Sequence, residues 1–337
     1  MSKTVSIRGA VTAENDVKSI SSASIRLIER IYFKNGIKDE DVINITISTT
    51  PDITAFYPAR AIREAGHAVP LFSCVEPSID GALSGCIRVM ATADSDNPVR
   101  NVYLSGARAL RPDIAGRYAI ALDGPSGAGK STVAKLVSKT LGITYLDTGA
   151  LYRALGLKAI ENKVNTKDEK ALEKCLDKVE VSLSYENGVQ SVLLDGVDVS
   201  GRIRTPEVSM AASNVSAAPY VRKKLLGIQR KIAETQSVIL DGRDIGTVVL
   251  PDAEFKYFLT ASAEIRARRR FEELKAKGQN VVYEDVLRDV NERDKNDSTR
   301  AVAPLKKAYD AVEINSDDMT AEDVANLIVA TVKEDVL

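Results

Sequence analysis

A glycine-rich run, GPSGAGKST, extends from Gly124 to Thr132 and has the spacing G-x-x-x-x-G-K followed by serine or threonine. Such glycines let backbone amides surround the β-phosphate of a nucleoside triphosphate, and the following helix adds positive potential at its N-terminus. Lys130 would bridge the β- and γ-phosphates, and the Ser131 hydroxyl would ligate Mg²⁺. The predicted triphosphate-binding loop consists of Gly124, Pro125, Ser126, Gly127, Ala128, Gly129, Lys130, Ser131 and Thr132.

A second polar segment, DTGALYR, follows at Asp147 to Arg153 and would place an arginine and a tyrosine beside the triphosphate. Phosphoryl transfer between two polyanions needs such an arginine, because the acceptor phosphate must be held within reacting distance. The alternative is a surface turn that leads into a helix. Asp147 is also a candidate for orienting the acceptor or the hydrated metal.

The first third of the chain has no motif of this kind, but it carries arginines in or beside apolar stretches. Arg88 interrupts the apolar run from Cys86 to Met90, and burial of a guanidinium is costly unless it meets an anion. The sequence therefore predicts a pocket for a small polycarboxylate. The alternative is structural pairing with Glu14, Glu64 and Glu76. The arginines concerned are Arg8, Arg60, Arg63, Arg88 and Arg111.

The composition limits the possible chemistry. A chain of 337 residues is long enough for two domains. The net charge of −1 provides no global attraction to nucleic acid or to an anionic membrane, and no apolar run is long enough to span a bilayer. A single histidine, His67, excludes a histidine-ligated metal centre and a Ser-His-Asp triad. Three scattered cysteines and the lack of signal-peptide features at the N-terminus predict a cytoplasmic protein.

The elements that position these residues follow from the apolar patterns. The first part should be α/β, with helices that begin near Ser21 and after Pro58. Its strands are expected over 42–48, 86–90 and 99–104. The segment 111–117 contains proline and glycine and precedes the apolar run 118–122, so it is the expected boundary between two domains.

The second part alternates strands and helices in βα order, which predicts a parallel sheet with right-handed crossovers. The helix after the phosphate loop should run from about Thr132 to Leu141. Strands are expected over 118–123, 144–146, 238–240 and 255–259. The segments 180–185 and 191–194 flank Asn187-Gly188 and predict an antiparallel hairpin, which we interpret as part of a small inserted subdomain.

From about Tyr118 to Leu337 the chain resembles bacterial cytidylate kinases. The resemblance lies in GPSGAGKST, LDTGALYR, DVSGRIRTPEVSMAAS, DGRDIGTVV and RDKNDSTRAVAPL. It implies a P-loop nucleoside monophosphate kinase with a parallel sheet flanked by helices, a CMP-binding subdomain inserted at about 175–213 and a lid at about 268–283. It also implies phosphate transfer from ATP, with Mg²⁺, to CMP or dCMP.

The resemblance implies a role for each matching residue. Arg153, Arg243 and Arg300 match the arginines that clamp the acceptor phosphate, and these three act with Lys130 and Asp147 in catalysis. The base would be read by Ser213, Arg222 and Asp244, and the sugar would be bound by Arg293 and Asp297. The complete implied CMP site is Thr148, Tyr152, Arg153, Ser213, Arg222, Asp244, Arg293, Asp297 and Arg300, with Ser131 as the metal ligand.

A cluster of arginines from Arg266 to Arg270 has three interpretations. It can be a solvated helix face or an RNA-binding patch, and the neutral overall charge disfavours the latter. The resemblance favours a lid in which at least one of Arg268, Arg269 and Arg270 covers the nucleotide phosphates.

The first part resembles the monofunctional, barrel-type chorismate mutases over about Ser6 to Asp113. The matching segments are IRGA, TPDITAFYPARAIRE, GCIRVM and VYLSGARALRPD. The resemblance implies a trimeric α+β pseudo-barrel with active sites between subunits, and rearrangement of chorismate to prephenate without a cofactor. Arg8 would hold a carboxylate, Arg88 would donate to the ether oxygen and Glu76 would orient the hydroxyl. The implied chorismate site is Arg8, Tyr57, Arg60, Arg63, Cys74, Glu76, Arg88, Tyr103 and Arg111.

The sequence therefore predicts a bifunctional enzyme, with a chorismate mutase domain at 1–115 and a cytidylate kinase domain at 116–337. It predicts a homotrimer formed through the first domain, the substrates CMP or dCMP, ATP and chorismate, and no nucleic-acid or membrane partner. One alternative is a kinase that carries a catalytically inactive, mutase-like trimerisation domain. Another is a nucleotide-regulated binding protein. The preference among CMP, dCMP and UMP stays open.

Overall fold

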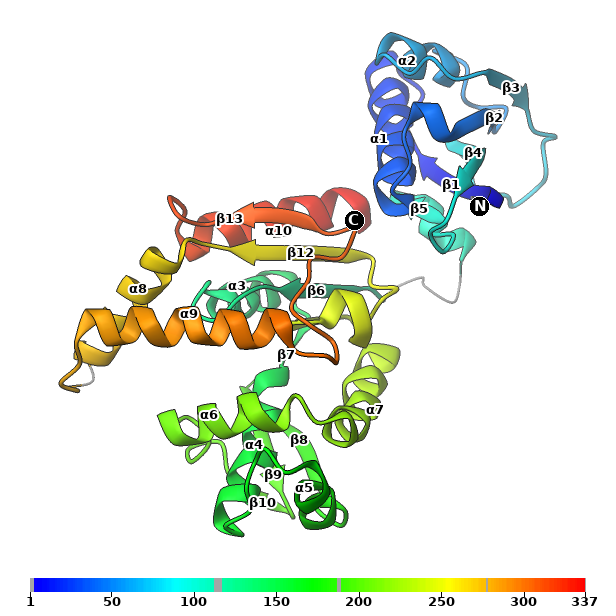
Figure 1. Cartoon of the computed structure of the whole chain (residues 1–337). Helices are drawn as coiled ribbons and strands as arrows, with labels where there is room; N and C mark the ends of the chain where they lie inside the picture. Colours follow the sequence, from blue (N-terminus) through cyan, green and yellow to red (C-terminus); the bar gives the residue numbers. More distant parts are fainter. Residues whose placement is uncertain (1–2, 112–116, 187–188, 277, 337) are drawn as a thin grey trace. The chain divides into compact units, whose positions relative to one another are not determined.

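A computed structural model describes residues 3–111, 117–186, 189–276 and 278–336 of the chain. By its contacts the chain divides into two compact units, Met1–Gly116 with Ala330–Leu337, and Arg117–Val329. Figure 1 labels the elements of each unit. The predicted boundary between 115 and 116 and the predicted turn at Asn187-Gly188 lie outside the described residues, so both stay predictions. No helix in the described ranges combines the length and apolarity needed to span a membrane.

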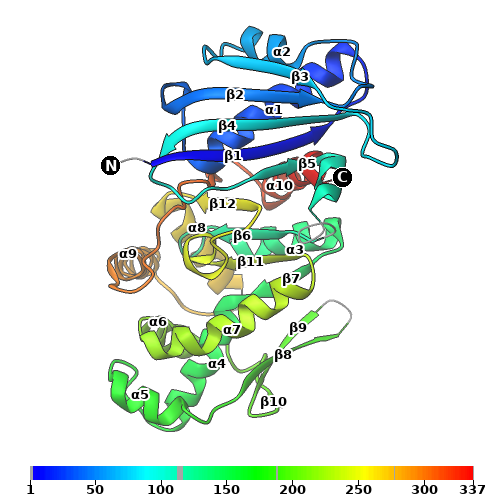
Figure 2. The ribbon, with the colours of Figure 1, turned by 90° about the vertical axis from the view of Figure 1, so that its right-hand side faces the viewer.

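The first unit is a mixed sheet with two α-helices on one face, and Figure 2 shows its strands in the order β3-β2-β4-β1-β5. The strands are β1 (Lys3–Thr12), β2 (Val42–Thr49), β3 (Leu71–Val75), β4 (Cys86–Ser95) and β5 (Val102–Leu104). The helical elements are α1 (Val17–Asn35), η1 (Asp39–Asp41), α2 (Pro58–Glu64) and η2 (Ser105–Leu110). Helix α1 begins earlier than expected because Asp16 caps it by accepting from the Ser19 amide at 2.9 Å.

Alternation along β1 and β4 gives this sheet two different faces. Ile7, Ile87 and Val89 point into the core, where they join the buried side chains of α1. Arg8 and Met90, which are paired across β1 and β4, therefore project from the opposite face. At one end of that face η2 packs through Ala107, while Phe72 and Met90 are 65% and 46% exposed.

The strand expected over 99–104 is shorter in the structure, where β5 contains only Val102–Leu104. The backbone groups of Arg100 bond instead to the side chain of Asn35. Asn35 Oδ1 accepts from the Arg100 amide at 2.9 Å, and Asn35 Nδ2 donates to the Arg100 carbonyl oxygen at 3.0 Å. A buried side-chain amide has thus replaced the ladder hydrogen bonds of a neighbouring strand.

The second unit contains the predicted parallel sheet, with the strand order β13-β12-β6-β11-β7. These strands are β6 (Ala119–Asp123), β7 (Thr144–Asp147), β11 (Val238–Gly242), β12 (Phe255–Thr260) and β13 (Val312–Asn315). Asp123, Asp147 and Asp241 stand at the carboxyl ends of β6, β7 and β11. Because the strands are parallel, these three acidic residues lie along one edge of the sheet.

The helices of this unit surround the sheet and form a second lobe. They are α3 (Lys130–Leu141), α4 (Thr148–Glu161), α5 (Glu169–Leu176), α6 (Pro206–Val215), α7 (Pro219–Thr235), the π-helix η3 (Ile245–Val249), α8 (Ala263–Ala276), α9 (Tyr283–Thr299) and the part of α10 (Ala321–Val336) up to Val329, the rest of α10 being assigned to the first unit. Strands β8 (Val181–Glu186) and β9 (Val189–Leu194) pair antiparallel, with β10 (Val197–Asp198) beside β9, so the predicted hairpin is confirmed.

The lobe lies below the parallel sheet in Figure 1 and includes more of the chain than the predicted insertion at 175–213. Its buried core extends from Ala150 on α4 to Leu225 on α7. Helices α4 and α6 pack closely at Gly156, where a Cβ would lie 2.9 Å from the Ala212 amide nitrogen. A side chain at Gly156 would therefore force the two helices apart. With glycine there, α4 packs directly against α6 of the lobe.

Candidate active sites

The loop between β6 and α3 has the conformation that its glycines permit. Gly124 has φ 149°, and a Cβ there would lie 1.9 Å from the Leu259 carbonyl oxygen of β12. No side chain fits in this position, so the loop can pass close to the neighbouring strand only with glycine. Helix α3 starts at Lys130, earlier than the predicted Thr132. The amides of Lys130 and Ser131 thus belong to the helix N-terminus, where anions bind.

Lys130 is buried, and its Nζ donates to the Pro125 carbonyl oxygen at 2.7 Å. Burial, together with the nearby Arg243 guanidinium, lowers the pKa of Lys130 to about 7. A phosphate group bound beside it would favour the charged form. The Lys130 side chain therefore points into the phosphate loop, where it is predicted to contact the triphosphate.

Two acidic side chains near the loop were not singled out from the sequence. Asp241 accepts from the Ser131 hydroxyl at 2.9 Å and from the Tyr145 hydroxyl at 3.0 Å. Burial, and then the nearby Asp147, raise the pKa of Asp241 to about 6. Asp123 is also buried. The signal that could have found both residues is that each directly follows a buried parallel strand, at the edge where such sheets bind ligands.

The donor set beside the loop fits Mg²⁺. This ion commonly takes one or two oxygen ligands from the protein and completes its shell with water and substrate phosphates. The Ser131 hydroxyl and the Asp241 carboxylate are 2.9 Å apart, next to the phosphate loop. They are the residues that would hold the ion with a bound triphosphate.

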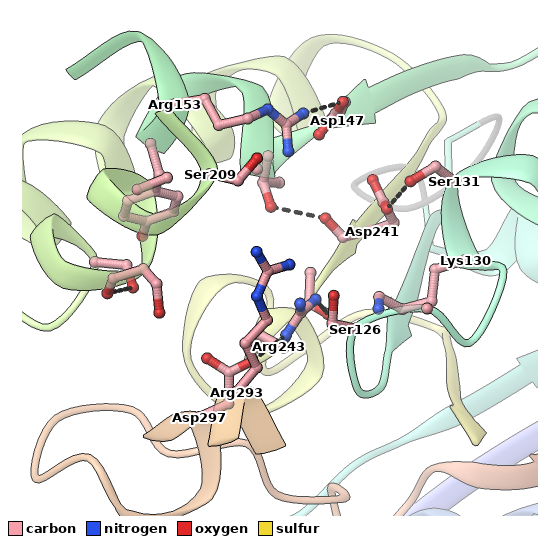
Figure 3. Close-up of a pocket in the computed structure, with 18 of the residues that line it drawn as sticks. Ser126, Lys130, Ser131, Asp147, Arg153, Ser209, Asp241, Arg243, Arg293 and Asp297 are labelled. Carbon is pink, nitrogen blue, oxygen red and sulfur yellow. Dashed lines mark hydrogen bonds and ion pairs between the residues drawn. The ribbon is translucent and has the colours of Figure 1, made fainter. Parts of the chain in front are cut away.

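A cavity of about 510 Å³ extends from this loop between α4, α6 and α9 (Figure 3). Figure 3 shows Lys130 and Ser131 on one side of it, Arg153 with Asp147 on another, and Arg243 and Arg293 near Asp297. Arg153 donates to Asp147 at 2.7 Å and Arg243 donates to Asp297 at 2.7 Å. The predicted kinase residues that line the cavity are Ser126, Gly127, Gly129, Lys130, Ser131, Thr132, Asp147, Thr148, Tyr152, Arg153, Ser213, Arg222, Arg243, Asp244, Arg293, Asp297 and Arg300.

At the end of the cavity predicted to read the base, a carboxylate lies between two guanidiniums. Arg222 Nη2 donates to Asp244 Oδ2, and Arg300 Nη2 lies 3.6 Å from Asp244 Oδ1. The three side chains are only 7–9% exposed. Within the described part of the chain, Arg300 Nη2 and Arg153 Nε are buried without a hydrogen-bond partner. Buried donors of this kind mark a place where an anion can bind.

The arginine cluster of α8 is divided in its contacts. Arg266 is buried and holds the phosphate loop, because it donates to the Ser126 carbonyl at 3.0 Å and pairs with Asp294 of α9. Arg269 and Arg270 line the cavity, and Arg268 is exposed. Arg269 donates to the Ser316 carbonyl oxygen at 2.6 Å and Arg270 pairs with Glu273 at 2.8 Å, so a lid role would require these two side chains to exchange their present partners for the nucleotide phosphates.

In the first unit, five of the candidate mutase residues lie in one row across the open face of the sheet: Cys74, Glu76, Arg88, Tyr103 and Arg111. Arg88 is opposite Ser48 of β2 on one side and Ala10 of β1 on the other. The row continues to Cys74, which is opposite Ser48, and to Tyr103, which is opposite Ala10.

Glu76 joins this row through its side chain. Its Oε2 accepts from Arg88 Nη1, and its Oε1 accepts from the Ser48 hydroxyl at 2.5 Å. At the other end of the row, the Arg111 guanidinium lies 5.4 Å from the centre of the Tyr103 ring. Charged and aromatic groups thus line one strip of the open face.

The remaining candidates of this unit lie elsewhere in the single chain. Arg60 pairs with Glu64 at 2.7 Å, and Arg63 donates to the carbonyl oxygens of His67 and Val69. Tyr57 is 73% exposed. The pairing alternative is thus realised for two predicted arginines, Arg60 with Glu64 and Arg88 with Glu76.

Within the single chain Arg8, Arg60 and Arg63 are exposed, so one subunit alone does not desolvate them. The reason is geometric: β1 and α2 present these side chains on faces that no element among the described residues covers. Arg88, 29% exposed, is the arginine for which the argument holds best.

Two family models match the chain: Cytidylate kinase over 120–334 and Chorismate mutase type I over 4–114. The cytidylate kinase of Caldicellulosiruptor saccharolyticus is 52% identical over 205 residues, which are 61% of this chain and 91% of that protein. The cytidylate kinase of Carboxydothermus hydrogenoformans is 49% identical over 220 residues, which are 65% and 99%. A solved chorismate mutase from Clostridium thermocellum is 34% identical and covers 31% of this chain and 98% of its own, with a TM-score of 0.31. The chain therefore belongs to the cytidylate kinase family and carries a type I chorismate mutase domain ahead of the kinase domain.

Proposed function

We propose that the chain is a bifunctional enzyme that phosphorylates CMP or dCMP with ATP and rearranges chorismate to prephenate. The kinase half is supported by one observation above all: a single cavity joins a phosphate-binding loop to an end with several arginines. Such a cavity can hold a donor triphosphate and an acceptor monophosphate at the same time. A nucleotide-regulated binding protein would need the loop but not the acceptor end.

In this proposal the acceptor nucleotide is bound by charge at both ends. Arg153 and Arg243 hold its phosphate, whereas Arg300, which the resemblance assigns to the phosphate, faces Asp244 at the base end of the cavity. At the base, Asp244 accepts from the exocyclic amine of cytosine and Arg222 donates to the carbonyl and ring nitrogen. Arg293 and Asp297, which line the same cavity, bind the sugar, and the hydrogen bond from Arg243 to Asp297 at 2.7 Å supports this by fixing the carboxylate.

Catalysis then follows from alignment and charge neutralisation, because phosphoryl transfer needs little covalent help from the protein. Lys130 and the acceptor arginines place positive charge around the migrating group. Mg²⁺ held by Ser131, Asp241 and the phosphates would add further positive charge there. Arg269 and Arg270 would exclude water as α8 closes over the nucleotide. Loss of an arginine that stabilises the transition state costs about 10³–10⁵ in rate in related systems.

The mutase half is supported by the row that contains Arg88, Glu76 and Ser48. In a pericyclic rearrangement the protein supplies shape and charge, and a guanidinium aimed at the ether oxygen stabilises the negative charge that develops as the C–O bond breaks. Glu76 accepts from Arg88 and Ser48 and holds the guanidinium in place. The substrate hydroxyl would be a further donor to this carboxylate.

The open face also supports the trimer. The row of candidate residues lies beside exposed Phe72 and Met90, and an apolar patch next to charged groups is typical of a subunit interface. Another copy of the chain would cover this face, enclose the row and bring its own residues to the substrate. The alternative, an inactive trimerisation domain, predicts the same assembly without turnover.

The free cysteines Cys74, Cys86 and Cys175 agree with a reducing compartment such as the cytoplasm.

A paired experiment tests both activities. Chorismate loss and CMP-dependent ATP consumption are measured in the wild type, Lys130→Ala and Arg88→Ala, with Lys135→Ala as a control because Lys135 is exposed on the same helix as Lys130. Lys130→Ala should abolish only ATP consumption, and Arg88→Ala should lower only chorismate loss, by about 10²–10³-fold. A wild type without chorismate loss would favour the inactive module. A wild type that consumes no ATP on addition of CMP would favour the binding protein.

A further inference from the structure

Asp123 is a buried carboxylate that no step of the proposed mechanism uses. It ends β6, and its side chain reaches across to η3, where Oδ1 accepts from the Ile245 amide and Oδ2 accepts from the Gly246 amide, both at 2.7 Å. These are the first two amides of η3, which have no partner inside the helix. Asp123 thus does for η3 what an N-cap residue usually does.

The residue at the N-cap position of η3 is Asp244, and its side chain makes no capping hydrogen bond. Other aspartates of this chain behave differently. Asp16, Asp147 and Asp168 stand at the N-caps of α1, α4 and α5, and each accepts from an amide of its own helix. The Asp244 carboxylate instead bonds to Arg222 and faces Arg300 in the cavity.

We propose that Asp123 is a positioning residue for acceptor recognition: it caps η3 in place of Asp244 and so leaves Asp244 free to read the base. This inference rests on the proposed kinase function. Both oxygens of Asp123 are needed, because an amide side chain can accept from one backbone N–H but would present its own N–H groups to the other. Asp244 could then swing back to the uncapped amide and leave the cavity.

The surrounding structure makes the arrangement specific. Gly242 pairs with Asp123 in the β11–β6 ladder, so the turn that carries Arg243 and Asp244 starts directly beside the Asp123 carboxylate. The next residue along the chain is Gly124, the first of the phosphate loop. The buried side chain of Asp123 therefore links the start of the phosphate loop to the turn proposed to recognise the acceptor nucleotide.

The test is Asp123→Asn in the full chain, with kcat and KM measured for CMP, UMP and ATP. We expect kcat/KM for CMP to fall about tenfold or more, as for a lost hydrogen bond to a charged group. The preference for CMP over UMP should shrink by a similar factor, while the KM for ATP changes less than about twofold. In an Asp244→Asn background the same substitution should have no further effect on the preference.

Ile120→Ala is the matched control, because Ile120 is fully buried on the same strand and its truncation destabilises the sheet without altering the carboxylate. It should lower the melting temperature and leave the CMP preference unchanged. If Asp123→Asn does not fold, Asp123→Ser, which keeps one acceptor in a smaller side chain, takes its place. If the wild type is an active kinase and the Asp123 variant keeps the same preference for CMP over UMP, this inference is overturned and the proposed function stands. A wild type without CMP-dependent ATP consumption would overturn the proposed function instead.

Discussion

Replacement of Asp244 by asparagine tests the base-reading end of the cavity through both stability and selectivity. The Asp244 side chain is 7% exposed, and the two guanidiniums that face it, those of Arg222 and Arg300, are each 9% exposed. An asparagine side chain is neutral and nearly isosteric with aspartate, so the substitution removes charge and leaves shape. It leaves two buried cations without their shared counter-ion.

The magnitude follows from this burial. Removal of one partner of a buried ion pair costs about 3–5 kcal/mol of folding free energy. In a domain of this size each kcal/mol lowers the melting temperature by about 2–4 °C, so the expected fall is about 6–20 °C. The lost hydrogen bond from the cytosine amine should lower kcat/KM for CMP by about 10- to 150-fold. Activity with UMP should fall less, because an amide can donate to the uracil carbonyl.

The assay combines thermal unfolding with a coupled measurement of ATP consumption. Because ATP stabilises only the unit that binds it, the transition that added ATP shifts identifies the kinase unit. Asp310→Asn is the control, since Asp310 is fully buried and both its oxygens lie 2.8 Å from Lys256 Nζ. It should lower the melting temperature comparably and leave selectivity unchanged. The reasoning is refuted if Asp244→Asn keeps the CMP preference, or if Asp310→Asn loses it equally.

Three further predictions concern assembly, metal and pH. Phe72→Lys should convert the proposed trimer to monomers in sedimentation velocity and abolish chorismate turnover while CMP kinase activity remains; an unchanged sedimentation coefficient contradicts the proposed interface. EDTA should stop ATP consumption and leave chorismate loss intact, and equal inhibition of both would refute the assignment of Mg²⁺ to the kinase alone. Burial raises the pKa of Asp39, but hydrogen bonds from His67 and the Ala68 amide outweigh it and lower the pKa overall. Such a carboxylate stabilises the fold above its unfolded pKa of about 3.9 and loses this effect as pH falls through the lower folded value. The stability advantage of the wild type over Asp39→Asn, measured by thermal unfolding, should therefore vanish in that acidic range, and an advantage that persists there would show that charge is not its source.

The parts of the fold that could be predicted are those set by local pattern. Buried strands such as Val238–Gly242 and the phosphate loop have periods and spacings that few other structures produce. The length of β5 could not be predicted, because it depends on Asn35, a residue of α1 that is distant in the sequence and close in the structure. An alternating pattern indicates where a strand can form. Its length depends on which groups bond to its backbone, and those groups can come from distant parts of the sequence.

The candidate sites show the same division. The acceptor arginines could be named because their motifs resemble a family, and the acidic residues at strand ends could have been named from sheet geometry alone. The capping of Ile245 by Asp123 could not, since 122 residues separate them and no spacing rule connects them. The exposure of Arg8 in the single chain could not be predicted from its apolar neighbours, because adjacent residues on a strand point to opposite faces. Which side chains are desolvated depends on what packs against each face of the sheet, and the pattern of one strand does not show this.

The close packing of α4 against α6 at Gly156 has a consequence for motion during turnover. Because α4 and α6 are in close contact there, we expect Arg153 on α4 and Ser213 on α6 to move together in any shift of the lobe. Arg243 and Asp244 follow β11 and belong to the sheet. In the proposed acceptor site a bound monophosphate would contact both the lobe and the sheet, so the distance between Arg153 and Arg243 should shorten if CMP draws the lobe toward the sheet.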